Sequence, residues 1–254
     1  MIDKQPKIVA LCGKGGVGKT SLSALITRVL MENRSNRILA IDADPAIGLA
    51  TSLGFKIGNS VDNIRNELID RLKKRTAGDS SQITKQLDYD LLEAIEEREN
   101  LAFLAIGRPE KEGCYCQVNA ILRDLIASLS RNFDFVVIDG EAGIEQVNRR
   151  VMESVTHLLL VSDGSQKGIN VAHTIAAVAD KSIKHEAKGI FFNRVKQEEL
   201  SLLTSKINLD LFGWLSEDDL LRQFDIEGKS LLEMGETQSM KAVRQCVDRL
   251  FSHQ

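Results

Sequence analysis

The feature that most constrains the fold is a glycine-rich segment near the N-terminus, residues 13–20, with the sequence GKGGVGKT. An apolar run typical of a buried strand precedes it at residues 7–11, and apolar residues at helical spacing follow it up to residue 32. A glycine, four residues and then Gly-Lys-Thr, placed between a strand and a helix, is the pattern of a phosphate-binding loop. The segment therefore predicts a strand–loop–helix unit that holds a nucleotide.

The residue types in this loop suit the phosphates of a nucleoside triphosphate bound with magnesium. Glycines let backbone N–H groups approach a phosphate closely, and the helix N-terminus adds partial positive charge. We expect Lys19 to reach the β- and γ-phosphates and the Thr20 hydroxyl to ligate Mg²⁺. The expected nucleotide-binding residues of the loop are Gly13, Lys14, Gly15, Gly16, Val17, Gly18, Lys19, Thr20 and Ser21.

A dinucleotide site is the competing interpretation of the same glycines. Gly13, Gly15 and Gly18 also fit Gly-x-Gly-x-x-Gly, and Asp42 ends the next predicted strand at a suitable distance. That shorter pattern is weak support when it stands alone, and a Lys-Thr pair has no role in a dinucleotide site. The longer pattern therefore favours a nucleoside triphosphate.

Composition narrows the class of protein and its partners. The chain has 254 residues, 43% hydrophobic and 27% charged, which is the balance of a globular protein. Its net charge of −3 gives no general attraction to nucleic acid or anionic membranes, and no apolar run approaches the ~18 residues of a membrane span. We therefore expect a cytoplasmic protein with neither nucleic acid nor membrane as a partner. The four cysteines are then expected to be thiols or metal ligands.

Strand-like apolar runs alternate with helical patterns along the chain. This alternation predicts an α/β fold with a doubly wound, mostly parallel sheet and helices on both faces. The predicted strands are Lys7–Leu11, Arg37–Asp42, Leu101–Ile106, Phe133–Asp139, His157–Ser162, Gly189–Asn193 and Leu209–Leu215. Because no linker or repeat interrupts the pattern, residues 1–254 are expected to form one domain.

Residues 58–100 differ from the rest because they are highly charged. They predict two helices, at residues 61–75 and 83–97, joined by a polar turn at residues 77–81. The stretch is either a solvated helical insertion or a surface on which a partner docks. The charge favours the solvated insertion.

Acidic residues at the ends of predicted strands should complete the nucleotide site. Ligands of such sheets bind at the carboxyl ends of the strands, so Asp42, Asp44 and Asp139 should face the phosphates. Asp139 is the expected magnesium carboxylate, and Asp44 is expected to orient or deprotonate the attacking water. Asp42 is expected to hold magnesium-bound water, with the division of roles between Asp42 and Asp44 left open. The alternative is that these acids only cap the following helices.

Two further strand-end segments carry predicted roles. After Asp139, Gly140 and Gly143 flank Glu141-Ala142, so this loop is predicted to move with the presence or loss of the γ-phosphate. A second switch is predicted around Asp44. Asn193 and Arg194 end a later strand. A guanine site would need Asn-Lys-x-Asp there, and the missing carboxylate favours adenine. The expected nucleotide-binding residues outside the loop are Asp42, Asp139, Gly143, Asn193 and Arg194.

Together these motifs resemble the MinD/ParA/nitrogenase iron protein class of ATPases. The deviant loop of that class is matched by residues 14–20, its Asp-Pro switch by residues 44–45 and its strand-end aspartate by Asp139. The resemblance spans nearly the whole chain and implies an ATP-hydrolysing homodimer. It further implies that Lys14 crosses to the partner's nucleotide and that Asn193 contacts adenine. The catalytic residues expected on this basis are Lys14, Lys19 and Asp44.

A pair of cysteines, Cys114 and Cys116, suggests a metal site. Two thiolates are too few for a closed tetrahedral site in one chain. A two-fold dimer with this segment at its axis offers four, a set suited to zinc, nickel or an iron–sulfur cluster. The alternative is a pair of incidental thiols. Cys12 and Cys246 are expected to pack in the core.

The position of the Cys-Tyr-Cys motif, before a predicted helix at residues 118–130, resembles the CooC family of nickel-insertion ATPases. The resemblance implies nickel or zinc at Cys114 and Cys116, shared across the dimer, and a client such as carbon monoxide dehydrogenase or acetyl-CoA synthase. A bridging cluster of the nitrogenase iron protein kind is disfavoured because no cysteine lies just after Asp139, where that protein has one.

Two other functions remain open from the sequence. The first is a MinD/ParA-like positioning or partition ATPase, whose membrane form would expose an amphipathic C-terminal helix. Residues 240–251 are amphipathic, but packing of this helix on the sheet is the favoured interpretation. The second is a regulatory module that uses ATP only as a switch.

Overall fold

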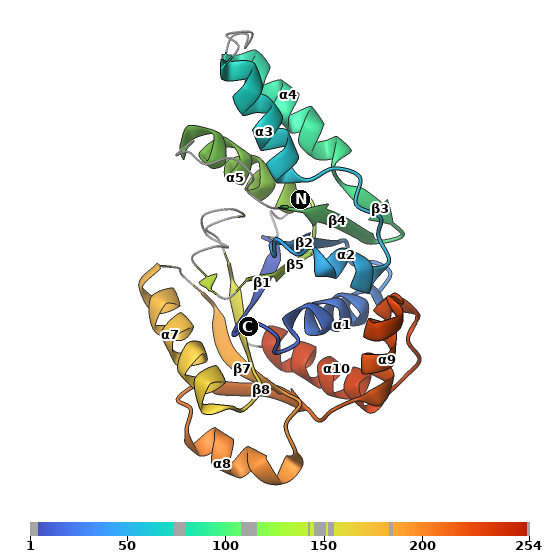
Figure 1. Ribbon diagram of the computed structural model, residues 1–254, viewed down its shortest axis with the longest axis vertical. Coiled ribbons are helices and arrows are strands. Elements are labelled where there is room, and N and C mark those ends of the chain that lie inside the picture. Colours follow the sequence, from blue (N-terminus) through green and yellow to red (C-terminus); the bar gives the residue numbers. More distant parts are fainter. Residues whose placement is uncertain are drawn as a thin grey trace.

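The computed structural model describes residues 5–73, 80–107, 116–141, 143–144, 151, 155–182 and 185–252. Within these residues the chain forms an eight-stranded sheet with the order β3-β4-β2-β5-β1-β6-β7-β8 (Figure 1). Every neighbouring pair is parallel except β3 with β4. The strands are β1 (Lys7–Cys12), β2 (Ile38–Asp42), β3 (Glu96–Arg98), β4 (Leu101–Ala105), β5 (Phe135–Asp139), β6 (His157–Ser162), β7 (Ala187–Asn193) and β8 (Asp210–Leu215).

The helices cover both faces of this sheet, each over its own buried apolar cluster. One face is covered by α1 (Lys19–Met31), α2 (Gly48–Leu53), α9 (Asp219–Glu227) and α10 (Gln238–Phe251). The other face is covered by α3 (Val61–Lys73), α4 (Ser80–Glu93), α5 (Cys116–Ser130), α7 (Gln166–Ser182) and α8 (Leu200–Ser205). Two short 3₁₀ helices lie at Gln197–Glu199 and Leu231–Glu233. The predicted doubly wound α/β fold is confirmed.

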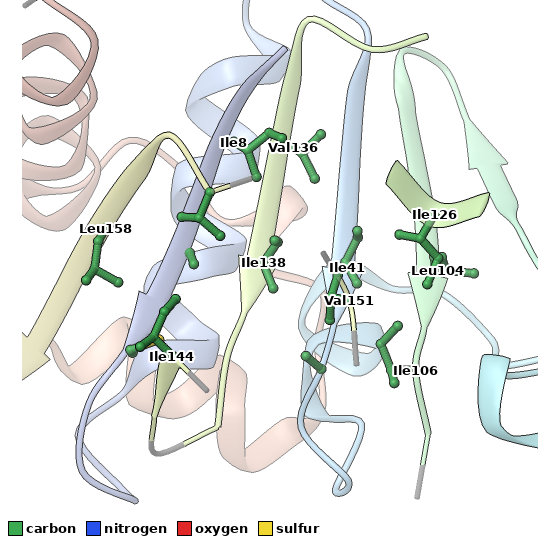
Figure 2. Packing of buried hydrophobic residues seen from close by; sticks show 14 of the residues in the cluster. Ile8, Ile41, Leu104, Ile106, Ile126, Val136, Ile138, Ile144, Val151 and Leu158 are labelled. Carbon is green, nitrogen blue, oxygen red and sulfur yellow. The ribbon is translucent and has the colours of Figure 1, made fainter. Parts of the chain in front are cut away.

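Central strands are apolar along nearly their whole length because both of their faces are buried. Figure 2 shows one face, where Ile8 of β1, Ile138 of β5 and Ile41 of β2 follow one another across the sheet. Leu104 of β4 and Ile126 of α5 continue the same cluster toward the sheet edge. The predicted strands are observed with ends shifted by at most two residues.

Two helices form, but the insertion departs from its prediction at both ends of the second helix. This helix begins at Ser80 rather than at residue 83, so that residues 80–81 of the predicted turn are helical, and residues 77–79 of that turn lie outside the described residues. The helix ends at Glu93 rather than at residue 97. Residues 96–98 instead form β3, which pairs antiparallel with β4. The reversal is a two-residue turn in which Glu99 adopts a left-handed conformation, with φ of 53°. Helical spacing alone could not detect this pairing, because β3 depends on the neighbouring strand.

Helix α10 packs onto the sheet, as favoured from the sequence. Thr237 caps its start, with Oγ1 accepting a hydrogen bond from the backbone N–H of Met240 at 3.2 Å. Its apolar face, which includes Val243, Cys246 and Leu250, is fully buried in the cluster shared with α1 and β8. In the described part of the chain, no helix combines the length and the apolar character needed to cross a bilayer.

Candidate functional site

The glycine-rich loop joins β1 to α1 and adopts a conformation that only glycine tolerates well. Gly16 and Gly18 have φ of 79° and 89°, in the left-handed region. A Cβ at Gly13 would lie 2.2 Å from the carbonyl oxygen of Val161, and one at Gly18 would lie 2.3 Å from Nδ2 of Asn193. Side chains at these positions would therefore displace the loop from neighbouring strand ends.

Lys19 curls back over the loop. Its side chain is largely buried, and Nζ donates to the carbonyl oxygens of Gly13 at 3.1 Å and Lys14 at 3.3 Å. A positive charge is thus held at the centre of the loop before any phosphate arrives. This is the position that the predicted contact with the β- and γ-phosphates requires.

Lys14 has a partner that the sequence did not suggest. Its Nζ donates to Oδ2 of Asp163, which follows β6, at 2.9 Å. Although partial burial opposes ionisation of Asp163, hydrogen bonds from Ser165 and Lys14 hold the pKa of Asp163 below its usual range. Both side chains are about 30% exposed, so the ion pair is weakened by solvent. Lys14 is therefore held within its own chain by an ion pair with Asp163, and this ion pair is weak enough for Lys14 to change partners.

Asp42 and Asp139 lie on adjacent strands and face each other in register. Both are fully buried. Oδ2 of Asp42 accepts from the backbone N–H of Leu49 at 2.8 Å, and Oδ1 accepts from that of Asp44 at 3.1 Å. Burial, with the nearby charge of Asp139, raises the pKa of Asp42 to about 7.

Asp139 has the features of a magnesium ligand. Ser23 donates to its Oδ1 at 3.1 Å, whereas Oδ2 is buried without a hydrogen-bond partner in the described part of the chain. Burial raises the pKa of Asp139 to about 6, even though the nearby Thr20 and Ser23 hydroxyls and the charge of Lys19 lower it. An unpaired buried carboxylate oxygen beside a threonine hydroxyl fits Mg²⁺, which prefers oxygen ligands.

Asp44 lies in the turn between β2 and α2, half-buried. Its Oδ1 accepts from the backbone N–H of Ala46 at 2.9 Å, and Ile47 follows with φ of 51°. A Cβ at Gly48 would come within 3.4 Å of Cγ2 of Thr20, so this turn lies against the start of α1. The turn that carries Asp44 is therefore close to the predicted magnesium ligand Thr20.

Asn193 and Arg194 brace the loop from the end of β7. Nδ2 of Asn193 donates to the carbonyl oxygen of Val17 at 2.8 Å, and Nη1 of Arg194 donates to that of Gly16 at 3.2 Å. Arg194 itself has φ of 60°, a conformation uncommon for a non-glycine residue. Both residues contact the backbone of the loop, and their predicted contact with the nucleotide stays a prediction.

Parts of the predicted site lie outside the described residues. These include Cys114 and, within the predicted switch after Asp139, Ala142. Cys116 is the first residue of α5, but its side chain is not among those that the structure describes. Among the described residues, no group of three or more His, Cys, Asp or Glu side chains could hold a metal ion. Cys12 and Cys246 are buried, as predicted.

Sequence reasoning missed three contacts of this site. Ser23 lies three residues after Thr20, on the same side of α1, and this spacing was a usable signal. Asp163 follows a predicted strand and so belongs to the same sheet edge as Asp42. The backbone N–H of Leu49 gave no signal, because its role depends on how α2 folds back on β2.

Known proteins of similar sequence include ATP-binding proteins, in agreement with the phosphate loop described above. Residues 6–188 match the model of the AAA domain family. An uncharacterised ATP-binding protein of Methanocaldococcus jannaschii is 34% identical over 255 residues, covering 96% of this chain and 98% of that protein. The carbon monoxide dehydrogenase accessory protein CooC of Rhodospirillum rubrum is 25% identical over 240 residues, covering 89% of each chain.

A solved structure reproduces the fold. The septum site-determining protein MinD of Pyrococcus horikoshii, complexed with Mg-ADP, superposes with a TM-score of 0.70 at 20% identity, covering 97% of this chain and 96% of that one. At that identity the likeness concerns the fold alone, and the family assignment rests on the sequence matches. The chain belongs to the AAA domain family of P-loop ATPases, in the class that includes MinD and ParA proteins.

Proposed function

We propose that this chain is a metallochaperone ATPase, which closes into a homodimer with ATP and supplies nickel to a client such as carbon monoxide dehydrogenase or acetyl-CoA synthase. The observation that carries the proposal is the place of the cysteine motif in the fold. Cys116 begins α5, the helix that follows β4, and Ala105 at the end of β4 pairs in register with Asp42. The cysteine segment thus leaves the sheet at the edge where the nucleotide site lies.

The nucleotide half of the proposal assigns a role to each charged group of the loop. Lys19 binds the phosphates, and Thr20 with Oδ2 of Asp139 holds Mg²⁺. When bound, Mg²⁺ would offset the charge on the β- and γ-phosphates. Asp42 orients water beside the ion. Asp44, on the turn between β2 and α2 that is predicted to move with the γ-phosphate, orients the attacking water.

Lys14 serves the partner's nucleotide in this proposal. To reach it, Lys14 must leave Asp163, and the exposed ion pair between them costs little to break. Once inserted at the partner's phosphates, its charge stabilises the transition state in a site from which water is excluded. Hydrolysis then depends on the dimer.

The base is proposed to be adenine. Nδ2 of Asn193 donates one of its two N–H groups to the Val17 carbonyl, which leaves its second N–H and the acceptor Oδ1 for a base. The choice of ATP over GTP rests on the missing carboxylate, because the Asn-Lys-x-Asp pattern of a guanine site is absent after Asn193.

The metal half of the proposal rests on two thiolates from each chain. Four thiolates at a dimer axis form a tetrahedral set that accepts nickel or zinc as cargo. Since the dimer closes with ATP, the set assembles or opens with the nucleotide. The likeness to CooC, whose name marks it as a carbon monoxide dehydrogenase accessory protein, supports this assignment.

Metal titration with and without ATP tests the proposal. Nickel and zinc are titrated into wild type, the Cys114→Ala/Cys116→Ala double variant and Lys19→Ala, which keeps both cysteines but should lose the nucleotide. We expect about one metal ion per dimer, dependent on ATP in wild type and lost in the double variant. Absence of stoichiometric metal in both nucleotide states of wild type would refute the metallochaperone function.

A MinD/ParA-like positioning ATPase is the alternative. The burial of the apolar face of α10 weighs against a form that binds membranes through this helix. Sedimentation with anionic vesicles distinguishes the two functions. ATP-dependent pelleting of the full-length protein would favour the positioning ATPase, and its absence would favour the metallochaperone.

A further inference from the structure

The hydroxyl of Ser23 bonds differently from other buried hydroxyls in the helices of this protein. Ser23 lies in the second turn of α1 and is fully buried, and its Oγ donates to Oδ1 of Asp139 at 3.1 Å. A hydroxyl inside a helix commonly bonds instead to the carbonyl oxygen four residues earlier. Thr27 on α1 and Ser130 on α5 do so, at 2.8 Å and 2.7 Å. The Ser23 hydroxyl is therefore directed at a strand end and not at its own helix.

This hydrogen bond leaves one oxygen of Asp139 available. Asp139 ends β5, which packs against α1, and its side chain is fully buried. Oδ1 accepts from Ser23, whereas Oδ2 is buried without a hydrogen-bond partner among the described residues. Because an unpaired buried carboxylate oxygen is costly, Oδ2 is the atom that a cation would engage.

Thr20 lies beside the same carboxylate. Thr20 and Ser23 are three residues apart on α1, so the two hydroxyls share one face of the helix. The Thr20 hydroxyl is close enough to Asp139 to lower the pKa of that carboxyl group. Thr20 belongs to the phosphate loop, whereas Ser23 lies one turn further along α1 and is absent from the residues predicted to bind nucleotide. Ser23 thus bonds the carboxylate oxygen that a cation at Thr20 and Oδ2 does not use.

Holding Oδ1 limits how Asp139 can bind a cation. Ca²⁺ takes more ligands than Mg²⁺ in a flexible geometry, and it accepts a carboxylate through one oxygen or through both. Mg²⁺ is smaller and needs nearly octahedral geometry, so the two oxygens of one carboxylate lie too close together to fill two of its positions. The terminal torsion of an aspartate is also broad, so a carboxylate without such a hydrogen bond can rotate. A carboxylate held by one oxygen therefore suits Mg²⁺ better than Ca²⁺.

We propose that Ser23 is a positioning residue that makes Asp139 a one-oxygen ligand and so favours Mg²⁺ over Ca²⁺ at the nucleotide. The inference rests on the proposed magnesium site of Thr20 and Asp139. It deepens that proposal by assigning the choice of ion to a residue outside the phosphate loop. Ser23 acts only through Asp139, and it contacts neither the ion nor the phosphates.

Calorimetric titration with Mg²⁺ and with Ca²⁺ tests this role in the full-length protein. The protein is kept in excess over the β,γ-imido analogue of ATP, which is not hydrolysed, so the metal affinity is measured without activity. We expect Ser23→Ala to bind Mg²⁺ about tenfold more weakly and to bind Ca²⁺ within about twofold of wild type. Ser130→Ala removes an equally buried hydroxyl that bonds within its own helix, and this matched control should change neither affinity.

The ratio of the two affinities separates a positioning role from a structural one. Equal weakening of Mg²⁺ and Ca²⁺ binding in Ser23→Ala, or no weakening of either, would overturn the proposed selectivity. Alanine is the best helix former, so the fold should survive this substitution, and thermal unfolding without metal checks that it does.

Asp139→Ala distinguishes failure of this inference from failure of the magnesium site. We expect Asp139→Ala to weaken the binding of both ions. If it does so while Ser23→Ala keeps the wild-type ratio, the magnesium site stands and the role of Ser23 is wrong. If Asp139→Ala binds Mg²⁺ as tightly as wild type, the magnesium site is wrongly assigned, and the role of Ser23 is wrong with it.

Discussion

The phosphate loop and the 58–100 insertion are built on different principles. The loop is defined by backbone conformation, with glycines at left-handed positions and strand-end side chains such as Asn193 holding its carbonyls. The insertion is defined by side chains, because α3 and α4 pack apolar faces on the sheet and Arg65 reaches across to α5. A site made from backbone leaves a recognisable spacing in the sequence, whereas a site made from packed side chains does not.

The two regions also differ in the surroundings of their buried charged groups. Around the loop, Asp42 and Asp139 are fully buried, and their raised pKa values express the cost of that burial. The insertion buries a charged group as well, but there Arg65 donates a hydrogen bond to Oδ1 of Asn119 at 2.8 Å. Near the loop, Oδ2 of Asp139 has no hydrogen-bond partner among the described residues, so a cation could offset its charge.

Replacing Lys19 should have the largest effect on nucleotide binding by the loop. Lys19→Ala removes the charge that is held against the loop carbonyls, so we expect ATP affinity to fall by at least about a hundredfold. Isothermal titration with ATP measures the loss, and thermal unfolding should show that the fold survives. Unchanged affinity for ATP would mean that the nucleotide site is wrongly assigned.

Replacing Lys14 should separate binding from catalysis within the same loop. We expect Lys14→Ala to bind ATP normally but to hydrolyse it about a hundredfold more slowly and to dimerise poorly, because its charge acts on the partner's nucleotide. Phosphate release and light scattering measure the two effects. The exposed Lys167→Ala is the control, and an unimpaired rate in Lys14→Ala would remove the role in the dimer.

Leu91 and Leu92 test the insertion, as neighbours on α4 with opposite surroundings. Leu91 is 1% exposed and Leu92 is 54% exposed. We expect Leu91→Ala to lower the free energy of unfolding by about 3 kcal/mol and Leu92→Ala by less than about 0.5 kcal/mol. Urea denaturation gives both values. ATP affinity should stay unchanged in both variants. A large loss of ATP affinity in Leu91→Ala would show that the packing of the insertion affects the nucleotide site, against the distinction drawn between the two regions.

The buried acids predict a smaller, pH-dependent effect. The pKa of Asp42 is raised from 3.8 to about 7, so between these values the folded protein binds more protons than the unfolded chain. This contribution to stability is fully present below pH 3.8 and is lost as the pH rises through 7.

Without nucleotide or Mg²⁺, we therefore expect unfolding free energy to fall between pH 5 and pH 8 by on the order of 2 kcal/mol. Asp42→Asn should reduce this dependence. Denaturation at a series of pH values measures it. A wild type that is as stable at pH 8 as at pH 5, or a variant with an undiminished slope, would argue against a raised pKa for Asp42.

Much of the fold and of the nucleotide site could be predicted from local patterns. Apolar runs at strand positions and helical spacing between them depend only on neighbours in the chain, so the sheet class and most strand ends were predictable. The loop spacing, and the aspartates that end β2 and β5, have the same local character. Lys14 and Asp163 are 149 residues apart, so no local pattern encodes their contact. The missed strand β3 and the contact of Leu49 with Asp42 involve residues only a few positions apart, but each depends on a turn that apolar spacing does not reveal.

The sequence by itself determined that this chain builds a phosphate loop with acids at the same sheet edge, because glycine spacing and strand-end residues act through the local backbone. Only the tertiary structure decided which groups meet across elements. Asp42 faces Asp139, Asp163 holds Lys14, and Arg65 meets Asn119 because separate elements pack against one another. The physical reason is that backbone conformation is a short-range property, whereas charge pairing and burial depend on the whole packed sheet.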